Sequence, residues 1–222
     1  MVITVHQALI QILTDPKAFL RDNLLQVGDF IGASGIKTAE FQTSQLGLTH
    51  NLTTAQRFGH VFRGLHKHGV QAFLFGANPK VNFQTTSVQV QFIQMYQYGG
   101  LAAIQWHPLA PIGPGSPNIV ITTKLTGCSF LVRTSPAGGI ECAHVQPGGA
   151  QTGQQLRQAL SGLHAGNYER LFGRGKSGEK GYGDSEASTI VGVRRQGAWK
   201  IYAQRLVNQQ ETLIDVERIY PA

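Results

Sequence analysis

The sequence predicts a fold of the α/β (α+β) class: a mostly antiparallel β-sandwich or mixed-sheet core with helices outside, led by an N-terminal helical pair. Apolar residues near the N-terminus recur at helical spacing, whereas alternating β-branched runs dominate the chain after residue 70. The 27 glycines suit the tight connections between such strands. The 222 residues fit one domain, 1–222, in which residues 1–36 form a helical extension.

The first part of the chain is predicted to be mainly helical. Val2–Leu13 carries apolar residues near helical spacing, and Asp15-Pro16 separates it from a second helix that continues to Leu25. Gly28–Lys37 is loop-like and lacks the spacing of a dinucleotide-binding turn. Thr53–His68 shows the clearest helical stripe, and we interpret its three histidines as part of a solvated basic face rather than a metal site.

From Val70 the pattern changes to strands. We expect strands at Gln71–Phe75, Ser87–Tyr98 and Leu101–Trp106, with a hairpin turn at Gly99-Gly100. The proline-rich segment His107–Pro117 cannot join a sheet interior. Because it leads directly into the next strand, we expect it to form one wall of the site described below.

The second half of the chain alternates strands and turns. Strands are predicted at Asn118–Leu125, Ser129–Arg133, Ile140–Val145, Ser188–Arg194, Ala198–Leu206 and Glu211–Tyr220. Thr152–Leu163 is predicted to be a short amphipathic helix, Gly166–Gly183 a basic glycine-rich loop, and Gln196-Gly197 a hairpin turn.

One thiol lies at the predicted turn before Ser129–Arg133, and one imidazole lies on the predicted strand Ile140–Val145. Antiparallel pairing of Ser129–Arg133 with Ile140–Val145 would bring Cys128 and His144 side by side although they are sixteen residues apart. An imidazole can lower the pKa of a thiol or accept its proton, which turns the sulfur into a useful nucleophile. Gly127 leaves the backbone before the thiol open to a substrate.

Two alternatives explain the same residues without catalysis. Cys128 and Cys142 are the only cysteines, and they could form a structural disulfide across the hairpin. Cys128, Cys142 and His144 could also bind a metal ion, although no fourth ligand occurs at a recognisable spacing. If neither holds, Cys142 shares a strand face with His144 and lines the site or packs beneath it.

The motif around the thiol resembles that of a known enzyme family. Leu125-Thr-Gly-Cys128 followed by His144 is similar to the Leu-Ser-Gly-Cys…His signature of the cytotoxic necrotizing factor family, with Thr126 in place of serine. Its superfamily includes Burkholderia lethal factor and the chemoreceptor glutamine deamidases, which also have a threonine six positions before the cysteine, as at Thr122. Ala143–Pro147 resembles the chemoreceptor enzymes, and Ala198–Gln204 resembles a late strand of the lethal factor.

The resemblance implies two packed mixed, largely antiparallel sheets flanked by helices, and a protein-glutamine deamidase without cofactor or metal. Cys128 would be the nucleophile and His144 the general acid–base. Thr122 would orient His144 through its hydroxyl or its backbone carbonyl, unless it serves only as a β-branched strand residue. The motif Leu125, Thr126 and Gly127 would surround the backbone N–H groups that hold the oxyanion. A lysine amine in place of water would make the same site a transglutaminase.

The resemblance also indicates the partner, a protein with an exposed glutamine. Family substrates are Rho-type GTPases, a translation initiation helicase and chemoreceptors. The formal charge of +7 suits an acidic surface. Arg170, Arg174, Lys176 and Lys180 belong either to a substrate-recognition loop or to a structureless connector. Gly175-Lys176-Ser177 fails as a phosphate loop because Arg170 stands where glycine is required.

The sequence also limits the cellular location of the protein and the other functions that it could have. The sequence shows no membrane span and no signal peptide. The resemblance to toxins implies a bacterial toxin or effector that is secreted or translocated into a host cytosol; otherwise we expect a cytoplasmic enzyme, and in either case a monomer. A non-catalytic basic binding module is the alternative from another class. Nucleic-acid binding is not expected, since the aromatic residues fall in core patterns rather than among the basic residues.

Overall fold

The computed structural model describes residues 3–28, 30, 32–43, 71–79, 84–163, 166–175, 181–207 and 212–221. The predicted helix Thr53–His68 lies outside the described residues, as do Lys176 and Lys180. No helix in the described part of the chain is long and apolar enough to cross a membrane.

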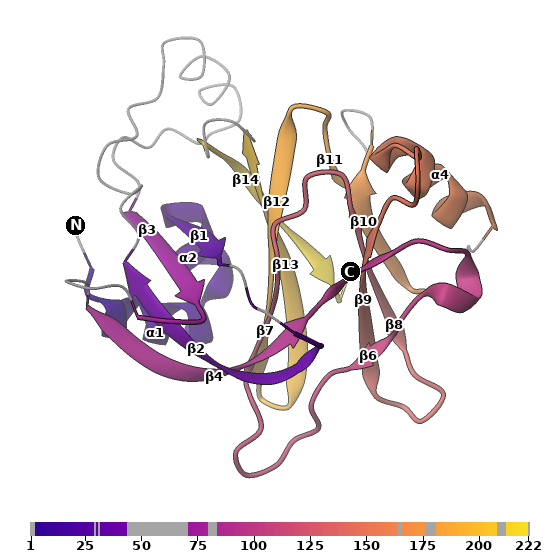
Figure 1. Cartoon of the computed structure of the whole chain (residues 1–222). Coiled ribbons are helices and arrows are strands. Elements are labelled where there is room, and N and C mark those ends of the chain that lie inside the picture. Colours follow the sequence, from indigo (N-terminus) through magenta and orange to yellow (C-terminus); the bar gives the residue numbers. More distant parts are fainter. Residues whose placement is uncertain are drawn as a thin grey trace.

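The described strands form an eight-stranded and a six-stranded sheet (Figure 1). In spatial order, the first contains β1 (Asn23–Val27), β3 (Gln71–Gly76), β2 (Gly35–Thr43), β4 (Thr85–Ile93), β7 (Ile119–Thr122), β12 (Glu186–Arg195), β13 (Ala198–Val207) and β14 (Thr212–Tyr220). The second contains β11 (Gly181–Tyr182), β10 (Arg170–Arg174), β8 (Ser129–Thr134), β9 (Ile140–Gln146) and β5 (Met95–Gln97), while β6 (His107–Pro108) also pairs with β9.

The pairings β1–β3, β4–β7, β5–β9 and β10–β11 are parallel, and the remaining described pairings are antiparallel. The predicted α+β fold with two mixed, largely antiparallel sheets is therefore confirmed.

Alternation of apolar residues along the central strands explains how the sheets pack. In β7, Ile119 and Ile121 face the cluster beneath the N-terminal helices, whereas Val120 faces the second sheet. The same switch occurs in β13, where Tyr202 faces the helices and Ile201 faces the second sheet. The central strands β7 and β13 are thus buried on both faces.

The molecule consequently has four layers: two N-terminal helices, the eight-stranded sheet, the six-stranded sheet and a second helical layer (Figure 1). The outer layer on the far side is α4 (Gly153–Leu163), whose Leu156 and Leu160 pack on Leu131 and Val145 of the smaller sheet. Burial of each such leucine contributes about 2 kcal/mol to folding.

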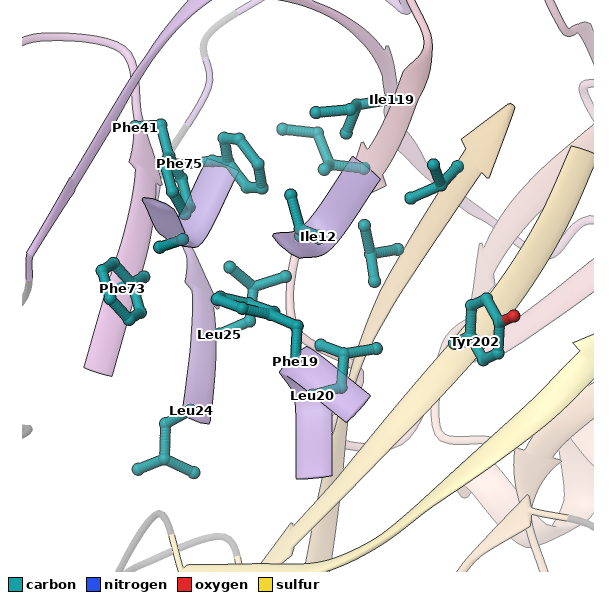
Figure 2. Packing of buried hydrophobic residues seen from close by; sticks show 14 of the residues in the cluster. Ile12, Phe19, Leu20, Leu24, Leu25, Phe41, Phe73, Phe75, Ile119 and Tyr202 are labelled. Atoms are coloured by element: carbon teal, nitrogen blue, oxygen red, sulfur yellow. The ribbon is translucent and has the colours of Figure 1, made fainter. Parts of the chain in front are cut away.

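The N-terminal helices form part of the main core. A capping box between Thr4 and Gln7 begins α1 (Val5–Thr14), and the Asp15 side chain caps α2 (Pro16–Asp22). Figure 2 shows the cluster to which these helices contribute; its labelled members are Ile12, Phe19, Leu20, Leu24, Leu25, Phe41, Phe73, Phe75, Ile119 and Tyr202.

The second helix is shorter than predicted because its last residues join a sheet. It ends at Asp22, and the chain continues as β1, parallel to β3. The buried amide of Gln204 on β13 fixes this junction: it accepts from the Leu25 N–H at 2.8 Å and donates to the carbonyls of Leu20 and Asn23, both at 2.6 Å.

Two strand predictions are wrong. The predicted strand Ser87–Tyr98 is two strands, β4 and β5, because the chain leaves one sheet for the other at Gln94. The predicted strand at Leu101–Trp106 is absent: Leu101–Ala103 is a single 3-10 turn. Since β5 pairs with β9, the glycine pair before that turn does not connect a hairpin.

Two predictions for the later part of the chain have opposite outcomes. Much of the predicted loop Gly166–Gly183 is strand, as β10 and β11. By contrast, Gln196-Gly197 is the predicted hairpin turn between β12 and β13, and both residues have positive φ, at 50° and 82°.

Candidate active site

The candidate residues lie where the chain passes from one sheet to the other, and two of them, Thr122 and His144, are in contact. Thr122 is the last residue of β7 in the larger sheet, and His144 lies in β9 of the smaller one. Cys128 immediately precedes β8, whose residue Phe130 pairs with His144. The chain therefore passes from the first sheet to the second between Thr122 and Cys128, and carries the thiol to the strand next to the imidazole.

The Thr122 hydroxyl fixes the tautomer of His144. Its oxygen lies 2.7 Å from the Ile93 carbonyl oxygen and 2.6 Å from Nδ1 of His144. A hydroxyl has one proton, and the carbonyl can only accept it. The threonine therefore donates to Ile93 and accepts from Nδ1–H of His144. The neutral imidazole then carries its free lone pair on Nε2.

Nε2 of His144 has no hydrogen-bond partner among the described residues, although the side chain is fully buried. A buried acceptor without a partner costs free energy and needs an explanation. No hydrogen bond joins Nε2 to the Cys128 thiol in this structure. Met95 pairs with His144 across β5 and β9, and its Sδ lies 3.3 Å from Sγ of Cys128. The thiol therefore contacts Met95, which is the strand partner of His144.

Burial controls the protonation of both groups. Desolvation raises the pKa of the Cys128 thiol to about 11, and backbone hydrogen bonds at Thr126 and Gly127 act in the opposite direction. Desolvation also lowers the pKa of His144 to about 3. At neutral pH the resting site therefore holds a thiol and a neutral imidazole. The expected lowering of the thiol pKa is not found, because burial outweighs the backbone bonds.

The motif before the thiol forms a tightly packed turn. Leu125 is buried and exchanges backbone hydrogen bonds with Ser188 of β12, at 2.8 and 2.9 Å. Thr126 is exposed, and Gly127 lies against the first residue of α4: a Cβ on Gly153 would overlap the Gly127 carbonyl oxygen. We refer to residues 125–128 as the nucleophile turn.

The predicted recognition loop is placed only in part. The Arg174 guanidinium forms an ion pair with Asp184, with Nε 3.0 Å from Oδ1, and its Nη1 lies 3.5 Å from the Thr126 carbonyl oxygen. Arg170 begins β10, and its guanidinium donates to the carbonyl of Glu169. Arg174 thus lies beside the nucleophile turn.

The two cysteines are not joined to each other. Cys128 and Cys142 are free and buried, and Cys142 lies in the middle of β9 with Val132 and His107 as its strand partners. The disulfide alternative is therefore wrong. Among the described residues, no group of three His, Cys, Asp or Glu side chains is arranged to hold a metal ion.

The proline-rich connection begins beside β9, where His107–Pro108 form β6, but its middle is anchored farther away. The buried Arg194 donates to the carbonyl of Ala110 at 2.7 Å and to Oδ1 of Asn118 at 3.1 Å, and Gln91 accepts from the N–H of Ala110. These contacts lie at the end of β7 opposite to Thr122, so the expected wall of the site is not formed by these anchored residues.

Two residues beside the thiol were not found by sequence reasoning. Met95 contacts the sulfur, and the buried Tyr182 donates its hydroxyl to the Cys128 carbonyl oxygen at 2.7 Å. Met95 sits in a run that reads as one continuous strand, and Tyr182 sits among glycines that read as a loop. Neither pattern carries a signal for the site.

Comparisons with known proteins give a limited result. No family model matches the chain, and no curated protein matches it by sequence. Among solved structures, the chain is similar to the C-terminal domain of CNFy from Yersinia pseudotuberculosis, with 8% identity and a TM-score of 0.44 over 97% of this chain and 99% of that one. A likeness at this level identifies neither a family nor an activity for the chain.

Proposed function

We propose that the protein is a protein-glutamine deamidase in which Cys128 is the nucleophile, His144 the general acid–base and Thr122 the residue that orients His144. The observation that carries this proposal is the pair of hydrogen bonds at the Thr122 hydroxyl, which leaves Nε2 of a fully buried imidazole as an acceptor unpartnered among the described residues. The resemblance of the Leu125–Cys128 motif and His144 to the deamidase signature supports the same assignment.

The resting protonation states favour a general-base route. Because the thiol is protonated and the imidazole neutral, Nε2 of His144 accepts the proton from Sγ of Cys128 as the sulfur attacks the carboxamide carbon of a glutamine. The new S–C bond forms as the C=O electron pair moves to oxygen. Backbone N–H groups of the nucleophile turn are the candidate donors to this oxyanion.

The proton that His144 has accepted then leaves with the ammonia. The imidazolium, held through Nδ1–H by Thr122, donates the proton on Nε2 to the departing nitrogen. The oxyanion electron pair re-forms the C=O bond as the C–N bond breaks, so that ammonia leaves and a thioester remains. Water attacks the thioester, His144 accepts a water proton and returns it to the sulfur, and glutamate is formed. We expect the protein to be a toxin or effector enzyme acting on a folded protein.

The test compares lysate proteins, by peptide mass spectrometry, after incubation with the wild type, with Cys128→Ser and with Cys142→Ala. Glutamines converted to glutamate by the wild type and by Cys142→Ala, but not by Cys128→Ser, would support the deamidase and name its substrate. Cys142→Ala is the matched control because it removes the other buried thiol.

Three other results of this experiment would lead to different conclusions. A glutamine joined to an amine would identify a transglutaminase at the same site. Glutamate formation that survives Cys128→Ser would contradict the assigned nucleophile. If the wild type modifies no glutamine in lysates of bacterial and of eukaryotic cells, the enzyme proposal is rejected and the basic binding module takes its place.

A further inference from the structure

Two residues beside the site, one in β10 and one in β11, contact the nucleophile turn. Arg174 and Tyr182 are strand partners in this short parallel pairing. Each reaches a different peptide group of the nucleophile turn: Arg174 lies near the carbonyl of Thr126, and Tyr182 donates to the carbonyl of Cys128. The two residues therefore hold the turn on both sides of Gly127.

The stronger of the two contacts is fully desolvated. Tyr182 is 1% exposed, and its hydroxyl bond to the Cys128 carbonyl oxygen is 2.7 Å long. Burial raises the pKa of this phenol, so it remains a donor at any working pH. A buried carbonyl that lost this donor would be left unsatisfied, and the turn would move to find another partner.

Close packing locks β10 and β11 against the thiol strand. A Cβ on Gly173 would overlap the Ser129 hydroxyl, and a Cβ on Gly181 would overlap the Gly173 carbonyl oxygen. Nη1 of Arg157 on α4 donates to that same carbonyl at 2.9 Å. The glycines let the two strands approach closely enough for Tyr182 to reach the backbone of Cys128.

We propose that Arg174 and Tyr182 form a clamp that positions Cys128 for His144, with Tyr182 as its main positioning residue. This inference rests on the proposed function. The clamp fixes the peptide groups around the sulfur, and with them the backbone hydrogen bonds from Thr126 and Gly127 that the sulfur receives. Neither clamp residue reacts with the substrate.

The test is a double-mutant cycle on thiol reactivity, which needs no known substrate. Rates of Cys128 alkylation by iodoacetamide are measured in a Cys142→Ala background for Tyr182→Phe, His144→Gln and the double variant. We expect His144→Gln to slow alkylation about tenfold or more when Tyr182 is present, and less than about twofold in the Tyr182→Phe background.

The matched control is Tyr168→Phe. Tyr168 also donates its hydroxyl to a backbone carbonyl, that of Leu160 at 3.1 Å, but on α4 rather than at the thiol. The effect of His144→Gln is expected to be unchanged in this background. Thermal melts of both Tyr→Phe variants report how much each change loosens the fold, so that a general loosening is separated from a loss of positioning.

A second measurement requires only single variants. The pH–rate profile of alkylation should shift to higher pH in Tyr182→Phe and in Arg174→Ala, because the sulfur loses the backbone bonds that lower its pKa, and Arg174→Lys should restore part of the shift. Tyr168→Phe should leave the profile in place.

The outcomes separate the two proposals. If His144→Gln slows alkylation equally with Tyr182 intact and in the Tyr182→Phe background, and the profile does not move, the clamp is rejected while the pair of Cys128 and His144 stands. If His144→Gln has no effect even with Tyr182 intact, the assigned pair fails, and the clamp fails with it.

Discussion

At the scale of single residues, burial sets the chemistry of the site more than sequence neighbours do. Because His144 is fully buried, its neutral form is favoured and its pKa falls to about 3. In the unfolded chain the same imidazole titrates near its usual value of about 6.5. Between these two values the unfolded chain binds a proton that the folded one does not, so folding must weaken as the pH falls through this range.

This difference predicts an acid-dependent stability. From pH 7 to pH 5 the wild type should lose about 2 kcal/mol of unfolding free energy more than His144→Gln does. Denaturant titrations at both pH values measure this difference directly. Because His107 also has a pKa lowered by burial, the comparison between variants, not the wild-type slope alone, carries the result. If the unfolding free energy changed equally between pH 7 and pH 5 in the wild type and in His144→Gln, the result would contradict a neutral, buried His144.

The sequence indicates some of these residues and hides others. The pairing of the strand that follows Cys128 with the strand that carries His144 can be predicted from strand spacing, and Thr122 can be selected from the motif. The raised pKa of Cys128 could not be predicted, since it depends on how completely the folded protein buries the thiol. Met95 and Tyr182 come near the sulfur through pairings with β9 and β10 that no local pattern encodes.

At the scale of elements, α4 and the nucleophile turn fit together through a single glycine. Gly153 begins the helix, and any side chain there would overlap the Gly127 carbonyl oxygen. Glycine normally weakens a helix by about 1 kcal/mol relative to alanine. At this position the close approach of the turn outweighs that cost. Gly162, near the other end of the same helix, has open space around its Cα.

Two alanine substitutions in α4 should therefore have opposite effects. Gly153→Ala should destabilise the protein by about 1–3 kcal/mol and lower glutamine deamidation, because the helix and the turn must separate. Gly162→Ala should stabilise it by about 0.5 kcal/mol and leave deamidation unchanged. Thermal melts and product yields of the two variants give the comparison. A Gly153→Ala protein that is as stable and active as Gly162→Ala would disprove the close fit.

Element prediction succeeded where turn chemistry is local. Gln196-Gly197 marks the β12–β13 hairpin because both residues must adopt positive φ. It failed where the chain changes sheets without a break in its alternation, as at Gln94 between β4 and β5. The strands β10 and β11 were not predicted for another reason. Their glycines allow the strands to pack closely, but a glycine-rich strand has the same composition as a loop.

At the scale of the whole molecule, the two N-terminal helices belong to the core rather than to its surroundings. Ile12, Phe19 and Leu20 are completely buried against the eight-stranded sheet. Each of them contributes about 2 kcal/mol. Their sum is comparable with the total stability of a typical domain, about 5–15 kcal/mol.

Deletion of residues 1–22 should therefore abolish cooperative folding. Circular dichroism melts of the shortened chain should lack the transition of the full chain, because one face of the larger sheet is left open to water. Ile10→Ser provides the control: this side chain is 49% exposed, and its replacement should cost little. A shortened chain that still melts cooperatively would show that the helices are a separable extension.

The position of Thr122 and His144 on different sheets has a consequence for the life of the chain before it is folded. Their hydrogen bond exists only when β7 and β9 have been brought together from opposite sheets. In a nascent or unfolded polypeptide, Thr122, Cys128 and His144 are not held in this arrangement. Under the proposed function, the protein is therefore inactive during synthesis and becomes active only after its two sheets have packed together.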